Sequence, residues 1–208
     1  MKIFKRMAIG SIVILACAVS LDAYGETFPV GAFLPMTGSG AHIGRVMSQG
    51  ALTAIDQIND EGGVKGYKFR LTIADFKNVD VNLAVTGVRK MIDVDKIPVV
   101  LAAYSPTTLA CQPVCAKANV LMVNGGAYSP RLMDKPFLFT IRLAQNQMVP
   151  AMLKFLWDKG ARKIGLLYLS DPSPIVPVNE SIKPTPTTRG GTIVADEPHP
   201  SGITDLNA

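Results

Sequence analysis

Histidine and cysteine are scarce in this chain of 208 residues, which has two histidines and three cysteines. His42 and His199 stand far apart in the sequence, and no cysteine joins them in the spacing of a zinc site. Cys17 belongs to an apolar N-terminal segment. Cys111 and Cys115 are four residues apart on a predicted helix, which is a poor geometry for a disulfide, so we interpret both as small buried apolar residues. We expect neither a metal ion nor another cofactor.

Motifs of catalysis and of nucleotide binding are also missing. No Ser-His-Asp, Cys-His or Gly-x-Ser-x-Gly arrangement can be assembled, so the nucleophile–base pair of a hydrolase is lacking and we predict no enzyme. The glycine-rich loop at residues 37–40 fits neither the P-loop nor Gly-x-Gly-x-x-Gly, and we interpret it as a ligand-lining loop or a plain connection. The acidic residues Asp56, Asp60 and Glu61 lie on one solvated helix face. We interpret Asp75, at the end of a predicted strand, as a turn or capping residue.

The excess of basic over acidic residues is small. The formal net charge is +5, and without residues 1–25 there remain 18 basic and 15 acidic residues, a net charge of about +3. No basic stripe with interleaved aromatic residues accompanies this mild charge, so we expect no nucleic-acid partner.

The long apolar run of the chain lies at its N-terminus. Three basic residues within the first six precede an apolar run at residues 7–19, and residues 23–25 (Ala-Tyr-Gly) fit the small-x-small rule for cleavage before Glu26. The run is short for a membrane span, so we predict an export signal over residues 1–25. A second interpretation is a lipoprotein box with an acyl anchor at Cys17.

Strand and helix patterns alternate along most of the remaining chain. The predicted strands are residues 28–34, 67–75, 97–102, 120–123, 137–142 and 163–169, and the predicted helices are residues 43–61, 81–94, 107–118 and 145–159. This alternation predicts an α/β fold with a doubly wound parallel sheet and right-handed crossovers. From residue 171 onward prolines crowd the sequence, and we expect a mobile, protease-sensitive segment over residues 171–208.

A polar turn follows the predicted strand at residues 97–102. Ser105 suits a helix N-cap and Pro106 the first helical position. The free amides of the first helical turn, together with the hydroxyls of Ser105, Thr107 and Thr108, would face a ligand carboxylate. An N-cap role alone would also explain Ser105.

A second polar turn, Asn-Gly-Gly-Ala at residues 124–127, follows the next predicted strand. Its bare backbone at Gly126 and Ala127 offers carbonyl groups that could accept hydrogen bonds from an ammonium group. Tyr128 comes next and is either a lid or stacking residue or a surface aromatic. Because parallel strands bring their carboxyl ends to one edge, the two turns predict a receptor for a small zwitterion.

Several short motifs occur in an order and spacing that resemble one known family. They lie at residues 30–38 (VGAFLPMTG), 50–66, 120–123 (VLMV), 127–130 (AYSP), 139–142 (FTIR), 189–194 (RGGTIV) and 202–205 (GITD). Together they resemble, over residues 28–208, the branched-chain amino-acid (leucine/isoleucine/valine) binding proteins, which are type I periplasmic solute-binding proteins of ABC importers. The resemblance implies a two-lobed receptor that closes over its ligand.

The resemblance also implies roles for particular residues. Ser105, Gly126 and Tyr128 are similar in position to the groups that hold the ligand carboxylate and ammonium in that family. A threonine is usual where Tyr128 stands and an aromatic residue often occurs near Ile43, and residues 171–174 read Asp-Pro-Ser-Pro where the family usually has Asp-Pro-Tyr-Gly. The departures at Tyr128 and near Ile43 argue against leucine as the ligand, and the one at residues 171–174 removes an aromatic contact.

The export signal and the resemblance together predict three segments: a signal peptide at residues 1–25, a first ligand-binding lobe at residues 26–143, and an incomplete, proline-rich start of a second lobe at residues 144–208. The chain thus resembles a truncated member. The expected function is that of an extracytoplasmic, periplasmic solute-binding component of an ABC transporter, which binds an amino acid or a related small amide or acid and presents it to an ABC permease. The alternative is a ligand-sensing receptor or regulator domain of the same fold.

Overall fold

The structure is a computed structural model that describes residues 26–170, 174–175, 178–184, 186 and 190–200. The predicted signal peptide, with its alternative lipid anchor at Cys17, lies outside the described residues. Part of the proline-rich segment lies outside them too.

A five-stranded parallel sheet forms the first lobe. Its strands are β1 (Thr27–Leu34), β2 (Lys68–Asp75), β3 (Val99–Ala102), β4 (Leu121–Asn124) and β5 (Leu138–Thr140). They lie in the order β2-β1-β3-β4-β5, and every neighbouring pair in this sheet is parallel. The chain steps outward from β1 to β2 and then returns past β1 to β3, so the winding reverses beside β1. The predicted doubly wound α/β fold is confirmed, and such sheets bind ligands at the strand ends beside the reversal.

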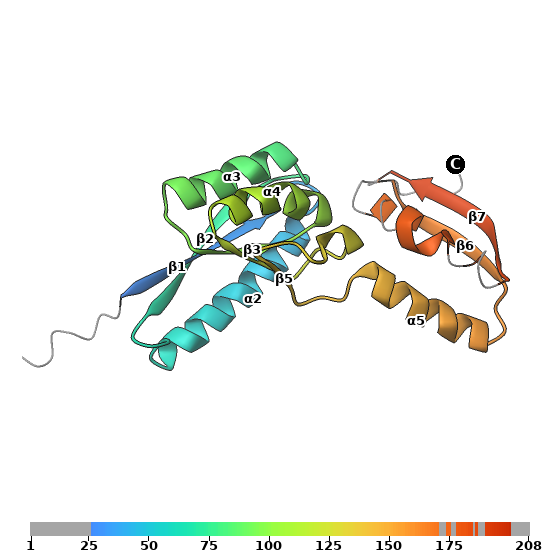
Figure 1. Ribbon diagram of the computed structural model, residues 1–208, viewed down its shortest axis with the longest axis horizontal. Coiled ribbons are helices and arrows are strands. Elements are labelled where there is room, and N and C mark those ends of the chain that lie inside the picture. Colours follow the sequence, from blue (N-terminus) through green and yellow to red (C-terminus); the bar gives the residue numbers. More distant parts are fainter. Residues whose placement is uncertain (1–25, 171–173, 176–177, 185, 187–189, 201–208) are drawn as a thin grey trace, which may run out of the picture.

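Three helices connect these strands: α2 (Ala41–Asp60), α3 (Val81–Asp93) and α4 (Ser105–Lys117). α3 and α4 cover one face of the sheet and α2 covers the other (Figure 1). α2 ends at a pair of glycines, Gly62 and Gly63, whose φ values of 106° and 83° lie in the left-handed region that favours glycine. The N–H of Gly63 donates to the carbonyl of Ile58 at 2.8 Å, which closes the last turn.

The core of the first lobe lies between the sheet and the helices α3 and α4. Its large buried side chains include Phe33, Phe76, Met91, Val100 and Met122. Cys111 and Cys115 of α4 are fully buried in the same cluster as free thiols. Burial raises the pKa of both thiols to about 12, so they stay protonated and unreactive. Their interpretation as small buried residues is confirmed.

The second lobe, as described, consists of α5 (Gln145–Asp158), β6 (Lys163–Leu169), the π-helical turn η2 (Val178–Ile182) and β7 (Thr192–His199). β6 and β7 pair in parallel, with one irregularity between Ile164 and Gly165. Figure 1 shows this lobe beside the first one, joined to it by the segment that follows β5.

β7 was not among the predicted strands, and it lies within the segment for which mobility was predicted from the prolines. Proline at position 198 and two acidic residues hide the strand pattern, and most of its side chains are exposed. Asp196 accepts a hydrogen bond from the Tyr168 hydroxyl at 3.0 Å and pairs with the Lys183 ammonium at 2.5 Å. The Tyr168 contact joins β7 to β6, the Lys183 contact joins β7 to the residue after η2, and neither contact is visible in the local sequence pattern.

The other predicted elements agree with the structure, mostly within two residues at each end. The strand predicted at residues 163–169 has those bounds in the structure, while β5 covers only three of the six residues predicted at 137–142. Ile141, Arg142 and Leu143 instead lead out of the sheet toward α5 as exposed residues. Residues 141–144 connect β5 of the first lobe to α5 of the second, and we call them the linkage.

Candidate functional site

The strand ends at the carboxyl edge of the sheet bring the predicted site residues together. β1, β3 and β4 are neighbours, and Phe33, Ala102 and Asn124 stand in register across them. In Figure 1 this edge faces the second lobe. The predicted residues all lie shortly after β3 and β4. The first turn of α4 holds Ser105, Thr107 and Thr108, and the turn after β4 holds Gly126, Ala127 and Tyr128.

The helix after β3 begins one position away from the prediction. The N-cap of α4 is Tyr104, with φ 65° and ψ 132°, and Ser105 is the first helical residue. The prediction of Ser105 as N-cap is therefore wrong, and Pro106 stands second in the helix. The physical reason is the sharp turn after β3, which Tyr104 makes in a backbone region that non-glycine residues rarely adopt. Because the turn is completed at Tyr104, the helix already begins at Ser105.

Ser105 joins the two polar turns. Its Oγ accepts hydrogen bonds from the N–H groups of Tyr128 at 3.3 Å and Ser129 at 3.1 Å. The residue is 4% exposed. Because two amides occupy the hydroxyl lone pairs, the O–H of Ser105 is the part that can donate to another group.

Thr107 and Thr108 use their hydroxyls inside the protein. Both residues are fully buried. Thr107 Oγ1 donates to the carbonyl of Ala103 at 2.8 Å, and Thr108 Oγ1 donates to that of Tyr104 at 2.6 Å. Threonine in the first turns of a helix commonly bonds a carbonyl four residues earlier, which explains why these hydroxyls do not face outward as the sequence suggested. They brace the turn at Tyr104.

Asn124 shapes the turn after β4, and the sequence analysis did not single it out as a site residue. It is fully buried. Its Oδ1 accepts from the N–H groups of Gly126 at 3.2 Å and Ala127 at 2.7 Å, and its Nδ2 donates to the Ala127 carbonyl at 2.8 Å. An asparagine just before two glycines is a known signal for such a turn. The bond to Nδ2 engages the Ala127 carbonyl, which was predicted to accept from a ligand.

Gly126 lies where the two turns approach most closely. A Cβ atom at this position would lie 3.1 Å from the Cβ of Ala103 and 3.2 Å from the Cε of Met47. These distances are tighter than nine in ten real Cβ contacts, so a side chain here would require its neighbours to move by a few tenths of an ångström. Glycine therefore permits the close approach that places Ser105 beside Tyr128.

The linkage contacts the turn after β4, and the guanidinium group of Arg142 packs directly against that turn. Arg142 Nη1 donates to the carbonyl of Gly126 at 3.2 Å, and its Cζ lies 4.9 Å from the centroid of the Tyr128 ring. The N–H of Ile141 donates to the Asn124 carbonyl at 3.0 Å, and that of Gln145 donates to the Tyr128 carbonyl at 2.9 Å. Arg142 was not predicted as a site residue, because its place in the sequence gives no sign of the turn that it contacts.

Asp75 holds the glycine-rich loop after β1. This agrees with the turn role that the sequence predicted for the residue. The carboxylate accepts from Thr37 Oγ1 at 2.5 Å, from the Met36 N–H at 2.8 Å and from the Lys77 N–H at 2.7 Å. Partial burial raises the pKa of Asp75, but these hydrogen bonds outweigh it and hold the pKa below its usual range. The N–H of Ser39 also donates to Asn78 at 2.7 Å. The loop is therefore anchored to the β2–α3 connection.

Two surface hollows lie away from this edge. One, of about 310 Å³, lies between β1, β2 and the turn before β2, where Phe28, Tyr67 and Phe69 line it. The other, of about 470 Å³, lies between α3 and α4. None of the predicted site residues lines either hollow. In the part of the chain that the structure describes, no group of three His, Cys, Asp or Glu residues is placed to hold a metal ion. No described helix combines the length and apolar character that crossing a membrane requires.

A comparison with known protein families identifies the family of this chain. A family model described as periplasmic binding protein matches residues 27–208. The chain belongs to the periplasmic binding protein family. Members of this family and fold are substrate-binding proteins. The predicted type I periplasmic-binding fold is thus confirmed by a family match over nearly all the described residues.

Individual family members show how much of the fold this chain represents. A Leu/Ile/Val-binding protein homologue from Brucella suis is 26% identical over 98% of this chain and 53% of its own length. A leucine-binding protein from Thermotoga maritima matches with a TM-score of 0.72 and 22% identity over 86% of this chain and 50% of its own. An ABC transporter solute-binding protein from R. palustris in complex with 4-hydroxybenzoate matches with a TM-score of 0.71 and 25% identity over 86% and 49%. The chain thus spans about half the length of these relatives.

Proposed function

We propose that this chain acts as the extracytoplasmic solute-binding component of an ABC importer, binding a small carboxylate-bearing molecule such as an amino acid or a related acid or amide. Family membership and the R. palustris and T. maritima neighbours support this class of function. The observation that carries the proposal is the double hydrogen bond to Ser105 Oγ, which assembles the start of α4 and the turn after β4 into one surface. This surface lies at the sheet edge where doubly wound folds bind ligands.

The chemistry of that surface suits a carboxylate. The first N–H groups of a helix have no acceptor within the helix and carry partial positive charge. In α4 these are the amides of Ser105 and Thr107, because Pro106 has none. The Ser105 O–H lies beside them. Thr107 is fully buried, so a ligand carboxylate would accept from the amide and hydroxyl of Ser105, and the second lobe would close over it about the linkage.

The proposal extends to the partner and the compartment. A receptor of this kind delivers its closed form to a membrane permease, which implies an extracytoplasmic site of action and no catalytic step. The ligand-sensing alternative shares the fold, and no feature of the described residues favours it.

The test replaces Ser105 with alanine in the full chain. We expect Ser105→Ala to weaken binding by about 1–3 kcal/mol, the scale of a hydrogen bond to a charged group in a desolvated site. Isothermal titration calorimetry would measure the affinity, after a thermal-shift screen of amino acids, amides and aromatic acids has identified a binder. Ser48→Ala is a matched control, because Ser48 is 5% exposed and donates to the Arg45 carbonyl of its own helix. Equal affinity in both variants would leave Ser105 with a purely structural role.

A further inference from the structure

One buried side chain at the junction of the two lobes holds a polar atom that has no hydrogen-bond partner. Gln145 is the first residue of α5 and is 9% exposed. Its Oε1 atom is shielded from solvent and accepts no hydrogen bond from any described residue. Buried acceptors in native proteins nearly always have a donor, and an unpaired one raises the free energy of the arrangement that contains it. The described arrangement therefore carries a cost that another arrangement of the lobes could remove.

The start of α5 does not depend on this side-chain oxygen. The side chain that caps the helix is that of Gln147, whose Oε1 accepts from the N–H of Ala144 at 3.0 Å. Gln145 instead uses its backbone, because its N–H donates to the Tyr128 carbonyl at 2.9 Å. The backbone of Gln145 is thus fixed to the turn after β4, while its Oε1 adds no hydrogen bond to the described residues.

Gln145 lies where the second lobe would pivot. It directly follows the linkage, and α5 packs against η2 within the second lobe (Figure 1). When two lobes close, a few residues at the connection absorb the change in backbone angles and the interior of each lobe stays the same. A side chain buried at the connection is therefore one whose partners change on closure.

The linkage itself offers donors close to this oxygen in the sequence. Arg142 stands three residues before Gln145, and its bond to the Gly126 carbonyl uses one of the five N–H groups of the guanidinium. Arg142 is exposed, so its other N–H groups are free to turn toward a new acceptor. A hydrogen bond from a charged donor is stronger than one between neutral groups. A rotation about the linkage that brings such a donor to Gln145 would therefore be favourable.

We propose that Gln145 is a positioning residue of the receptor, whose buried oxygen lacks a partner in the described arrangement and gains a donor when the second lobe closes over a ligand. The inference rests on the proposed receptor function and adds what stabilises the closed form. The unpaired oxygen raises the free energy of the arrangement without ligand, and the new hydrogen bond lowers that of the closed one. Both effects favour closure, so Gln145 increases the ligand affinity without contacting the ligand.

Replacing Gln145 with methionine in the full chain tests this inference, because methionine has nearly the same length and no strong hydrogen-bond group. Without ligand, we expect Gln145→Met to raise the midpoint of thermal unfolding by about 2–4 °C, since the unpaired oxygen is gone. With ligand, we expect the affinity to fall about five-fold, since the bond formed on closure is lost. Circular dichroism measures the midpoint, and isothermal titration calorimetry with leucine and with 4-hydroxybenzoate measures the affinity.

Two further variants complete the experiment. Gln145→Leu also lacks hydrogen-bond groups and should shift both quantities in the same directions as Gln145→Met. Gln147→Met is the matched control from the same helical turn. It removes the cap on Ala144, so it should lower the midpoint and leave the affinity unchanged.

The outcomes separate the inference from the proposed function. Lower midpoints in both Gln145 variants would show that the oxygen already has a structural partner, which would overturn the inference. An affinity equal to that of the wild-type protein would also overturn it and leave the receptor function standing. If the wild-type protein binds neither probe nor any compound in a broad screen of amino acids, amides and acids, the proposed function fails, and the inference that rests on it fails too.

Discussion

At the scale of single residues, two side chains organise the loops at the carboxyl edge. Asn124 bonds the backbone of Gly126 and Ala127, and Asp75 holds the loop at Met36 and Thr37. Each satisfies several backbone N–H groups that would otherwise lack partners near the sheet edge. Ligand-facing groups depend on this support, because a loop that is not held cannot keep its donors in place.

The role of Asp75 predicts an acid-dependent loss of stability. Its folded-state pKa lies below the ordinary value of 3.8, so its contribution is complete above about pH 4 and is lost as the pH falls through the folded-state pKa. At pH 7 we expect Asp75→Asn to lower the free energy of unfolding by about 1–2 kcal/mol, since an amide Nδ2 cannot accept the N–H bonds. Urea unfolding at pH 7 and pH 3 measures both values.

The difference between the wild-type protein and Asp75→Asn should shrink at pH 3, because the Asp75 carboxyl of the unfolded chain is then mostly protonated, which favours the unfolded state. Asp56→Asn, on the exposed side of α2, provides the comparison and should change stability little at either pH. A constant difference across the pH range would show that the charge of Asp75 is not what holds the loop.

At the scale of elements, the second lobe depends on the fit between α5 and the start of β7. A Cβ atom on Gly191 would lie 2.4 Å from Cζ2 of Trp157 and 3.2 Å from the carbonyl of Arg162. The backbone of Gly191 therefore packs directly against the indole ring of α5. The N–H of Thr192 donates to the same Arg162 carbonyl at 2.9 Å, which sets the start of β7 beside β6.

We expect Gly191→Ala to destabilise the second lobe by about 1–3 kcal/mol, because the added methyl group overpacks the contact with Trp157. Trp157 is the single tryptophan of the chain, so its fluorescence during thermal unfolding reports on this lobe directly. Gly165→Ala is the matched control on β6: its Cβ would lie 3.7 Å from that of Ala195, an ordinary contact. Equal midpoints for the two variants would contradict the close packing at Gly191.

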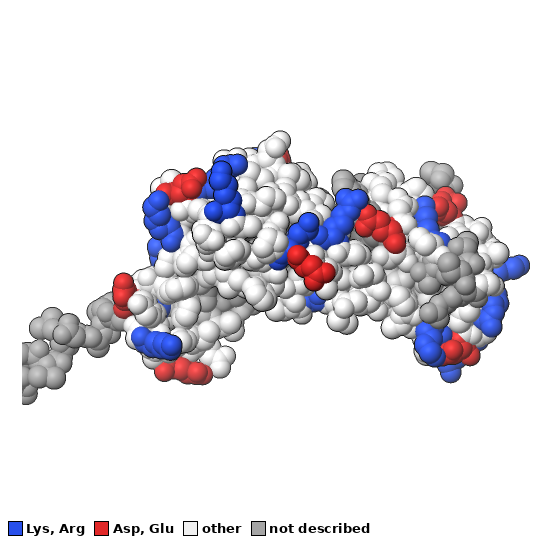
Figure 2. Space-filling view, in the orientation of Figure 1, with Lys and Arg blue, Asp and Glu red and all other residues white. Residues whose placement is uncertain are grey.

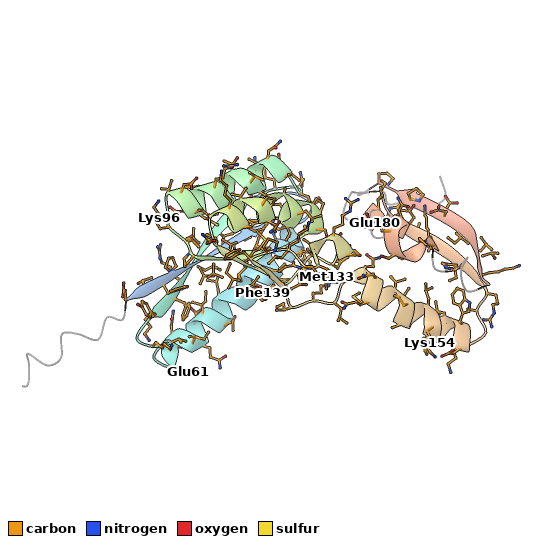
Figure 3. The ribbon with its side chains drawn as sticks, viewed as in Figure 1. Glu61, Lys96, Met133, Phe139, Lys154 and Glu180 are labelled. Atoms are coloured by element: carbon orange, nitrogen blue, oxygen red, sulfur yellow. The ribbon has the colours of Figure 1, made fainter. Side chains whose placement is uncertain are left out.

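At the scale of the whole molecule, an ion pair joins the two lobes in addition to the linkage. Arg131 of η1 (Pro130–Leu132) and Glu180 of η2 form an ion pair across the junction, with Nε and Oε1 3.0 Å apart. Figure 2 shows basic and acidic side chains next to one another there, and Figure 3 labels Met133 and Glu180 on the two sides of the junction. Both side chains of the pair are partly exposed to solvent, so solvent weakens their attraction.

We expect the Arg131–Glu180 pair to contribute less than about 1 kcal/mol to the free energy of unfolding, as exposed pairs usually do. A double-mutant cycle with Arg131→Gln, Glu180→Gln and the combined variant measures the coupling in urea unfolding. The coupling should decrease further in 0.5 M salt. A coupling of several kcal/mol that resists salt would instead identify the pair as a rigid clamp between the lobes.

Local patterns in the sequence were enough to predict the sheet and its helices. Apolar periodicity and the glycine pair after α2 depend on residues close together in the chain, and the bounds of most elements followed from them. The same patterns placed Ser105 and Gly126 in turns at one edge, because parallel strands leave little choice of where their ends meet. β7 was missed because its strand character comes from pairing with β6, some 29 residues earlier.

The contacts of the candidate site depend on the tertiary structure. Ser105 and Tyr128 are 23 residues apart, and Arg142 is 16 residues from Gly126. No periodicity links such positions, since their meeting depends on how the sheet order brings β3, β4 and β5 side by side. The inward bonds of Thr107 and Thr108 and the turn at Tyr104 likewise follow from the angle at which α4 leaves β3. Sequence patterns thus determine which segments form strands, helices and turns, whereas packing decides which of their polar groups remain free to meet a ligand.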